Sequence, residues 1–144
     1  MNIGKSSRPK PGETECGDGY LVLENGNKVL IAVADGLGHG SGAAKASRAA
    51  CRYIEEHGED PLTDILEGCG KAIRGTRGVA LTLLRILKDE QTLCYAGVGN
   101  VEMAAKTLNP IRPTNCPGIV GGRISRVKES RHPFNPGDFI SVYT

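Results

Sequence analysis

The sequence contains no tryptophan, and its other aromatic residues are four tyrosines and two phenylalanines. Few rings are therefore available to stack on nucleic-acid bases. A strong excess of basic residues is also absent, because 18 lysines and arginines face 16 aspartates and glutamates and leave a net charge of +2. These two absences argue against nucleic acid as a partner.

Disulfide, zinc and membrane patterns are missing as well. The cysteines at positions 16, 51, 69, 94 and 116 form no Cys-x-x-Cys pair, and an odd count does not suit a disulfide framework, so we expect free thiols. The N-terminus has no apolar signal core, and no apolar run approaches the roughly 20 residues of a membrane span. We expect a soluble, cytoplasmic protein without membrane contacts, folded as a single domain over residues 1–144.

What the sequence does have is an apolar run, residues 29–34, that ends at Asp35 and is followed by glycines at positions 36, 38, 40 and 42. Helical spacing from residue 43 onward places Asp35 between a buried strand and a helix. Because glycine tolerates positive φ and lets other groups approach the backbone closely, we expect a ligand to come near this loop.

The residues alone leave three interpretations of this loop. Residues 38–43 fit the dinucleotide pattern G-x-G-x-x-[G/A], although Asp35 would lie beside the pyrophosphate and no acidic residue ends a second strand about 20 residues later. The loop could also be a tight turn with a solvated aspartate. The third interpretation, which we favour, is a metal site in which the Asp35 carboxylate and the Gly36 carbonyl supply the oxygen ligands that Mg²⁺ or Mn²⁺ prefers.

A second aspartate is expected beside Asp35. Asn25-Gly26 lies between apolar runs at residues 20–23 and 28–31, which predicts a β-hairpin. Antiparallel pairing of these strands would bring Asp18 and Asp35 to the same edge of the sheet. Two carboxylates there repel each other unless a cation or a proton lies between them.

The remaining pattern predicts an α+β fold. Helical spacing indicates a helix over residues 41–57 with Gly58 as its C-terminal cap. Asp60 is expected to be the N-cap, and Pro61 the first-turn proline, of a second helix that ends near Arg74. Segments 78–88, 93–98 and 101–108 predict an antiparallel meander, and shorter strands are expected at 124–127 and 138–143. Residues 1–15 predict an edge strand or a loose arm.

Two motifs carry a resemblance to a known family. Asp35-Gly36 after an apolar strand, together with Gly17-Asp18-Gly19-Tyr20, resembles the first two metal motifs of the PP2C-like (PPM) serine/threonine phosphatases. Residues 34–40, Ala-Asp-Gly-Leu-Gly-His-Gly, are most similar to the small bacterial branch that regulates sigma factors, the RsbX-like and SpoIIE-like phosphatases. Residues 75–80 and 97–100 resemble glycine-rich motifs of that branch. The resemblance implies an α-β-β-α sandwich of antiparallel sheets flanked by helices.

The resemblance also implies a reaction and its residues. Asp18 and Asp35 would be catalytic metal ligands, the Gly36 carbonyl would be a further ligand, and the complete domain would hold two Mn²⁺ or Mg²⁺ ions. Water activated between two such ions hydrolyses phosphoserine and phosphothreonine without a covalent phosphoenzyme. The implied substrates are phosphorylated regulatory proteins of a bacterial sigma-factor or stressosome stress-response pathway, and the complete protein would be a monomer.

The chain departs from this family at its end. There the strand matching residues 138–144 continues into another Asp-Gly and a further acidic motif, whereas this sequence stops at Thr144. We therefore expect a domain that is incomplete at its C-terminus, either a fragment or a naturally short protein, and the alternative function is a non-catalytic phosphoprotein-binding module. Two other roles stay open: His39 as a general acid, and Arg77 as a phosphate clamp or a surface salt bridge.

Overall fold

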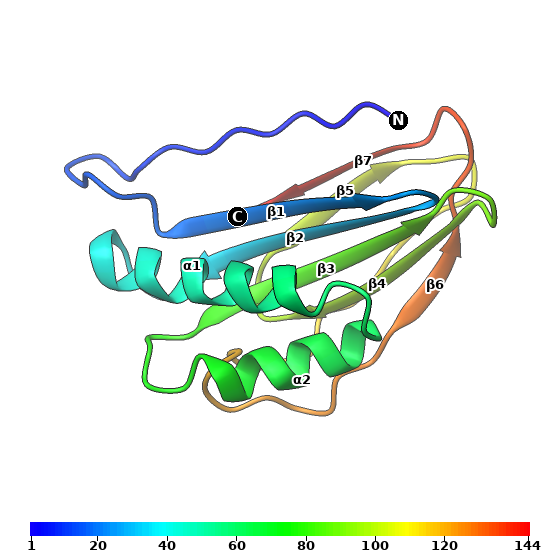
Figure 1. Cartoon of the computed structure of the whole chain (residues 1–144). Coiled ribbons are helices and arrows are strands. Elements are labelled where there is room, and N and C mark those ends of the chain that lie inside the picture. Colours follow the sequence, from blue (N-terminus) through cyan, green and yellow to red (C-terminus); the bar gives the residue numbers. More distant parts are fainter.

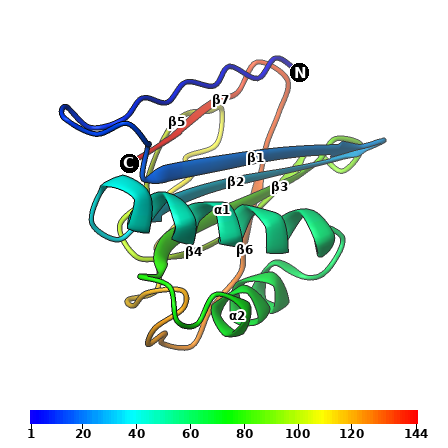
Figure 2. The same ribbon diagram turned by 60° about the vertical axis from the view of Figure 1, so that its left-hand side comes forward.

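Two antiparallel sheets and two helices make up the protein, as a computed structural model of residues 1–144 shows. The larger sheet has the strand order β1-β2-β3-β4-β6, and the smaller sheet pairs β5 with β7. Both helices cover one face of the larger sheet, and the smaller sheet lies on its other face (Figures 1 and 2). The elements are β1 (Asp18–Asn25), β2 (Lys28–Gly36), α1 (Gly40–Glu56), α2 (Leu62–Ala72), β3 (Val79–Leu87), β4 (Thr92–Val98), β5 (Glu102–Lys106), β6 (Ser130–Pro133) and β7 (Phe139–Tyr143).

The β1–β2 hairpin forms where the sequence predicts it. Asn25 pairs with Lys28, so the turn has two residues, and Gly26 takes the left-handed φ of 55° that such a tight turn requires. Each strand extends beyond its apolar run, and β1 begins at Asp18 while β2 ends at Gly36. The hairpin therefore places Asp18 and the Asp35-Gly36 motif at the same edge of the sheet.

The core has one part on each face of the larger sheet. On the helix side, alternate residues of β2 pack against the alanine face of α1 and against α2, whose buried residues include Ile65 and Leu66. On the other side, Val29, Leu84 and Tyr95 lie in a smaller cluster, against which Met103 and Ile140 of the second sheet pack. Because successive strand residues point to opposite faces, this pattern places Asp35 on the face toward the smaller sheet.

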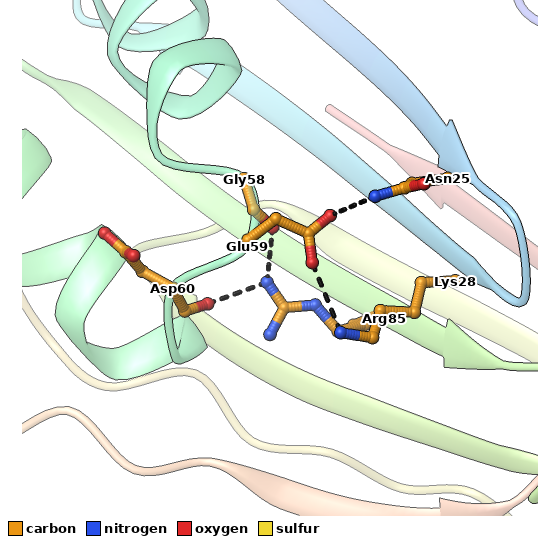
Figure 3. A network of polar contacts seen from close by, with 6 residues as sticks. All are labelled: Asn25, Lys28, Gly58, Glu59, Asp60 and Arg85. Atoms are coloured by element: carbon orange, nitrogen blue, oxygen red, sulfur yellow. Dashed lines mark hydrogen bonds and ion pairs between the residues drawn. The ribbon is translucent and has the colours of Figure 1, made fainter.

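The turn between the helices is fixed by Arg85 rather than by the expected caps. Gly58 has no left-handed φ, and neither helix has a side-chain N-cap, so the predicted capping roles of Gly58 and Asp60 are wrong. Instead, Nη2 of Arg85 donates to the carbonyls of Gly58 and Asp60, each at 2.7 Å (Figure 3). Glu59 accepts from Asn25 and Lys28 in the same network, and these hydrogen bonds lower the pKa of its carboxyl.

The predicted three-strand meander is wrong at its last strand. β3 and β4 pair as expected, but β5 leaves for the second sheet and pairs with β7, while the short strand β6 takes the place beside β4. Gly99, with φ of 90°, redirects the chain after β4. The side-chain amide of Asn115 then donates to the carbonyls of Gly99 and Val101 at 3.0 and 2.7 Å and holds this turn.

Smaller differences concern the ends of the chain. Residues 124–127 form one isolated bridge, Gly118 to Ile124, instead of a strand. The N-terminal residues form an arm without a strand. Asp138 has a structural role, because its carboxylate accepts from the backbone of Leu108 and Asn135. Neither helix has the length and apolar character needed to cross a bilayer.

Candidate active site

Asp18 and Asp35 lie directly opposite each other at the edge of the sheet. They are paired in the β1–β2 register, so their side chains point to the same face, and both residues are half-buried. The pKa of Asp35 is raised above 3.8, first by burial and second by the negative charge of Asp18. The fold thus holds the Asp18 carboxylate close enough to disfavour ionisation of Asp35, in line with the repulsion that the sequence predicts for this pair.

The end of the chain contacts this pair. β7 runs back toward the start of β1 (Figure 1). The Thr144 hydroxyl donates to Oδ2 of Asp18 at 2.8 Å. This hydrogen bond fixes one oxygen of the Asp18 carboxylate. Sequence reasoning missed Thr144, because the contact joins residues 126 positions apart.

The backbone around Gly36 leaves no room for a side chain. A Cβ at this position would lie 2.2 Å from the carbonyl oxygen of Ala43 and 2.7 Å from that of Gly17. Its amide donates to the Gly17 carbonyl at 3.1 Å, and the next amide, of Leu37, donates to the Gly78 carbonyl at 3.0 Å. The backbone that follows Asp35 is therefore held from both sides.

Gly38, in the loop, and Gly40 and Gly42, in the first turn of α1, face groups of the chain itself. A Cβ at Gly38 or Gly42 would meet the guanidinium of Arg77 at 2.6 Å, and one at Gly40 would meet the carboxylate of Glu13 at the same distance. The expectation that these glycines leave room for a ligand therefore needs correction. They make room first for the side chains of Arg77 and Glu13.

The structure shows which groups His39 and Arg77 contact. Nδ1 of His39 contacts Oε1 of Glu13 at 2.5 Å, and the imidazole is largely exposed. Arg77 forms no salt bridge with any carboxylate, and Nη1 donates to the His39 carbonyl at 3.3 Å. The surface salt bridge considered for Arg77 is therefore not formed.

Few side chains at this edge of the sheet could hold a metal ion. No group of three or more histidine, cysteine, aspartate or glutamate side chains is placed to hold a metal ion. The oxygen ligands at this edge are the carboxylates of Asp18 and Asp35 and the backbone carbonyls beside them. Two carboxylates balance the charge of one divalent cation.

Comparisons with known proteins agree with the motifs. No protein-family model matches the chain. The phosphoserine phosphatase RsbX of Bacillus subtilis is 27% identical over 137 residues, which are 94% of this chain and 69% of that protein. A structure from work on the bacterial stressosome as a modular signalling system is 31% identical with a TM-score of 0.90, over 94% of this chain and 71% of that one. Crystalline RsbX in complex with magnesium is 27% identical with a TM-score of 0.85, over 92% and 68%.

The chain belongs to the PP2C-like phosphatases of the RsbX and SpoIIE type. The PP2C domain of SpoIIE from Bacillus subtilis, 21% identical with a TM-score of 0.65 over 85% of this chain and 39% of that one, shares the fold. The dinucleotide interpretation is wrong, because it needs a parallel sheet and every strand pair here is antiparallel.

A cleft of about 380 Å³ lies beside the end of β2 in this phosphatase domain. Its lining includes Leu37, Ala80, Gly99, Asn115, Pro117 and Ile119. Ala80 is the strand partner of Asp35, which places the cleft beside that aspartate. Asn115 shapes it by bonding the turn after β4 and by accepting from the Tyr95 hydroxyl. Nothing in the sequence singled out Asn115, which lies in a loop rich in proline and glycine.

Proposed function

We propose that this protein is a metal-dependent phosphatase that hydrolyses phosphoserine or phosphothreonine on a regulatory protein of a bacterial sigma-factor or stressosome pathway, in the cytoplasm. One observation carries the metal part of this proposal. Asp18 and Asp35 face each other in register, and Gly36, whose carbonyl is the third ligand, directly follows Asp35 at the end of β2. These are the oxygen ligands that Mg²⁺ and Mn²⁺ take in proteins.

The electrostatics of the pair fit a cation. Burial and the neighbouring carboxylate raise the pKa of Asp35, so two ionised carboxylates at this edge cost free energy unless a positive charge lies between them. Asp18, Asp35 and the Gly36 carbonyl would hold the ion, and the Thr144 hydroxyl would orient the Asp18 carboxylate. A bound divalent ion lowers the pKa of coordinated water and offsets charge on phosphoryl oxygens.

The substrate class rests on the relatives. RsbX is named a phosphoserine phosphatase, and the 31% identical structure comes from work on the stressosome. The adjoining cleft supports a protein substrate, because its walls combine apolar side chains with backbone groups of the glycine-containing loops. A peptide that extends from a phosphoserine held at the aspartates would have this surface beside it.

The decisive experiment replaces Asp35 with asparagine. Asparagine keeps the size of the side chain and removes the anionic ligand, so Mn²⁺-dependent hydrolysis of a phosphoserine peptide should fall by orders of magnitude. Asp89→Asn is the matched control, because Asp89 is exposed and lies in the turn between β3 and β4. Equal turnover by parent and Asp35→Asn would exclude Asp35 from the chemistry.

A non-catalytic phosphoprotein-binding module is the second candidate. The observation that favours it is the small ligand set, with no cluster of three metal-binding side chains. Under this candidate the protein binds a phosphopeptide without hydrolysing it, and binding is independent of Mn²⁺. Calorimetry with the phosphopeptide, with and without Mn²⁺, separates the two functions.

A further inference from the structure

The guanidinium of Arg77 lies against the loop that follows the proposed metal ligands. A Cβ on Gly42 would be 2.6 Å from Nε and 2.7 Å from Cζ, and a Cβ on Gly38 would be 2.6 Å from Nη1. Only residues without a side chain let an arginine reach this position. The two glycines and Arg77 therefore form one structural unit.

Arg77 is nevertheless left with free donors. Its side chain makes one hydrogen bond, from Nη1 to the His39 carbonyl at 3.3 Å, and no carboxylate lies within 4.0 Å of it. A guanidinium has five N–H donors in a planar fork that matches two oxygens of a phosphate. The side chain is thus placed by the loop but not neutralised by it.

The backbone fixes Arg77 near the two aspartates. The Leu37 amide donates to the Gly78 carbonyl at 3.0 Å, and Asp35 is the strand partner of Ala80. Arg77 is three positions before Ala80, so their Cα atoms lie at most about 11 Å apart. The end of β2, the start of β3 and the start of α1 lie at the same edge of the molecule (Figure 1).

The start of α1 adds positive potential at this edge. The N-cap residue, His39, makes no side-chain cap bond, and the first turn holds no acidic residue. Free N–H groups and the positive end of the helix dipole both favour an anion. Glu13 is the carboxylate that touches this loop, where it pairs with the His39 imidazole and forms no ion pair with Arg77.

We propose that Arg77 binds the phosphoryl oxygens of the phosphorylated substrate and of the phosphate product. This inference rests on the proposed phosphatase function and adds a residue to it. Arg77 precedes β3, but its guanidinium lies against the loop that directly follows Asp35 and Gly36, and it supplies a positive charge to a site whose own side chains are acidic. Its role is to hold the phosphate, and it transfers no proton.

The test compares Arg77→Met, Arg77→Lys and the control Arg74→Met in the Mn²⁺-loaded protein. Arg74 is an exposed arginine of the same turn and makes no ion pair. Calorimetry measures the binding of inorganic phosphate, and steady-state kinetics measure KM for a phosphoserine peptide. Arg77→Met should weaken phosphate binding and raise KM by about tenfold or more, as expected for a lost hydrogen bond to a charged group. Arg77→Lys should restore only part of this, because an ammonium lacks the planar fork.

Two further readouts separate substrate binding from support of the loop. Calorimetry with Mn²⁺ and the Tm should be the same for Arg77→Met and Arg74→Met. A parallel loss of Mn²⁺ affinity and Tm in Arg77→Met would show that the arginine only supports the loop, and would overturn the proposal. Phosphate binding by Arg77→Met that equals the binding by Arg74→Met would also overturn the proposal. If phosphate binding depends on Arg77 but the parent has no turnover, the anion site is supported and only the proposed function fails.

Discussion

Gly36→Ala tests whether the loop after Asp35 depends on a residue without a side chain. The added methyl would lie 2.2 Å from the Ala43 carbonyl oxygen, 2.7 Å from the Ala43 carbonyl carbon and 2.7 Å from the Gly17 carbonyl oxygen. All three are backbone atoms, and the first two belong to the first turns of α1. A side chain could rotate away from the methyl, whereas these atoms move only if the strand and the helix separate.

The expected loss can be estimated from these contacts. Adding a methyl to a packed site typically costs about 1–3 kcal/mol, and backbone neighbours favour the upper end. Separating β2 from Gly17 also lengthens the 3.1 Å hydrogen bond between the Gly36 amide and the Gly17 carbonyl, worth about 1 kcal/mol. We expect the free energy of unfolding to fall by about 3–4 kcal/mol, which lowers Tm by about 10 °C for a domain of this size.

Urea denaturation and a thermal scan measure this change. Gly122→Ala is the control, because a Cβ there would lie 3.5 Å from its nearest neighbour, Ile119, an ordinary contact. The control should stay within about 0.5 kcal/mol of the parent. If Gly36→Ala has the same free energy of unfolding as the control, the backbone around Asp35 is not held by its contacts with Gly17 and Ala43 as the structure indicates.

Three further predictions concern charge and polar contacts. Because the pKa of Asp35 is raised, the stabilisation that protonated Asp35 provides should be lost as pH rises from 3.8 through the raised value. Urea denaturation of the metal-free protein should show this fall in the free energy of unfolding with pH, and Asp35→Asn should not show it. The 144-residue chain should bind at most one Mn²⁺ and bind it weakly, because two carboxylates cannot offset about four positive charges; a calorimetric stoichiometry of two would contradict this. Arg85→Met should lower the free energy of unfolding by about 1–3 kcal/mol, because the carbonyls of Gly58 and Asp60 lose their donor, and an unchanged urea midpoint would contradict this.

The parts of the fold that follow from local chemistry were predictable. An Asn-Gly turn between apolar runs fixed the hairpin, and its register brought Asp18 opposite Asp35. Helical spacing located α1 and α2 to within a few residues. The sheet to which β5 belongs was not predictable, because alternation of apolar residues marks a strand but not its partner. That choice depends on Gly99 and on hydrogen bonds from Asn115, which lies 14 and 16 residues away from its acceptors.

In the candidate site, too, only the residues that local sequence patterns bring together were predictable. The carboxylate pair and the Gly36 carbonyl come from one hairpin, so sequence reasoning could place them. The contacts of Thr144 and Arg77 join residues 126 and 38 positions apart, and no local pattern records them. Arg77 in particular had two equally open roles until the structure showed that it contacts glycines and no carboxylate.

The glycines of residues 36–42 lie between the proposed metal ligands and Arg77. A glycine in a loop indicates that something approaches the backbone closely, but it does not say whether that group is a ligand or another part of the chain. Here the approaching groups are the Ala43 carbonyl, the Arg77 guanidinium and the Glu13 carboxylate. The loop therefore holds a cation of the protein itself at the same edge of the sheet as a pair of carboxylates, without neutralising it. A phosphorylated side chain, which needs both a metal held by those carboxylates and a donor for its remaining oxygens, is the kind of ligand that such an arrangement suits.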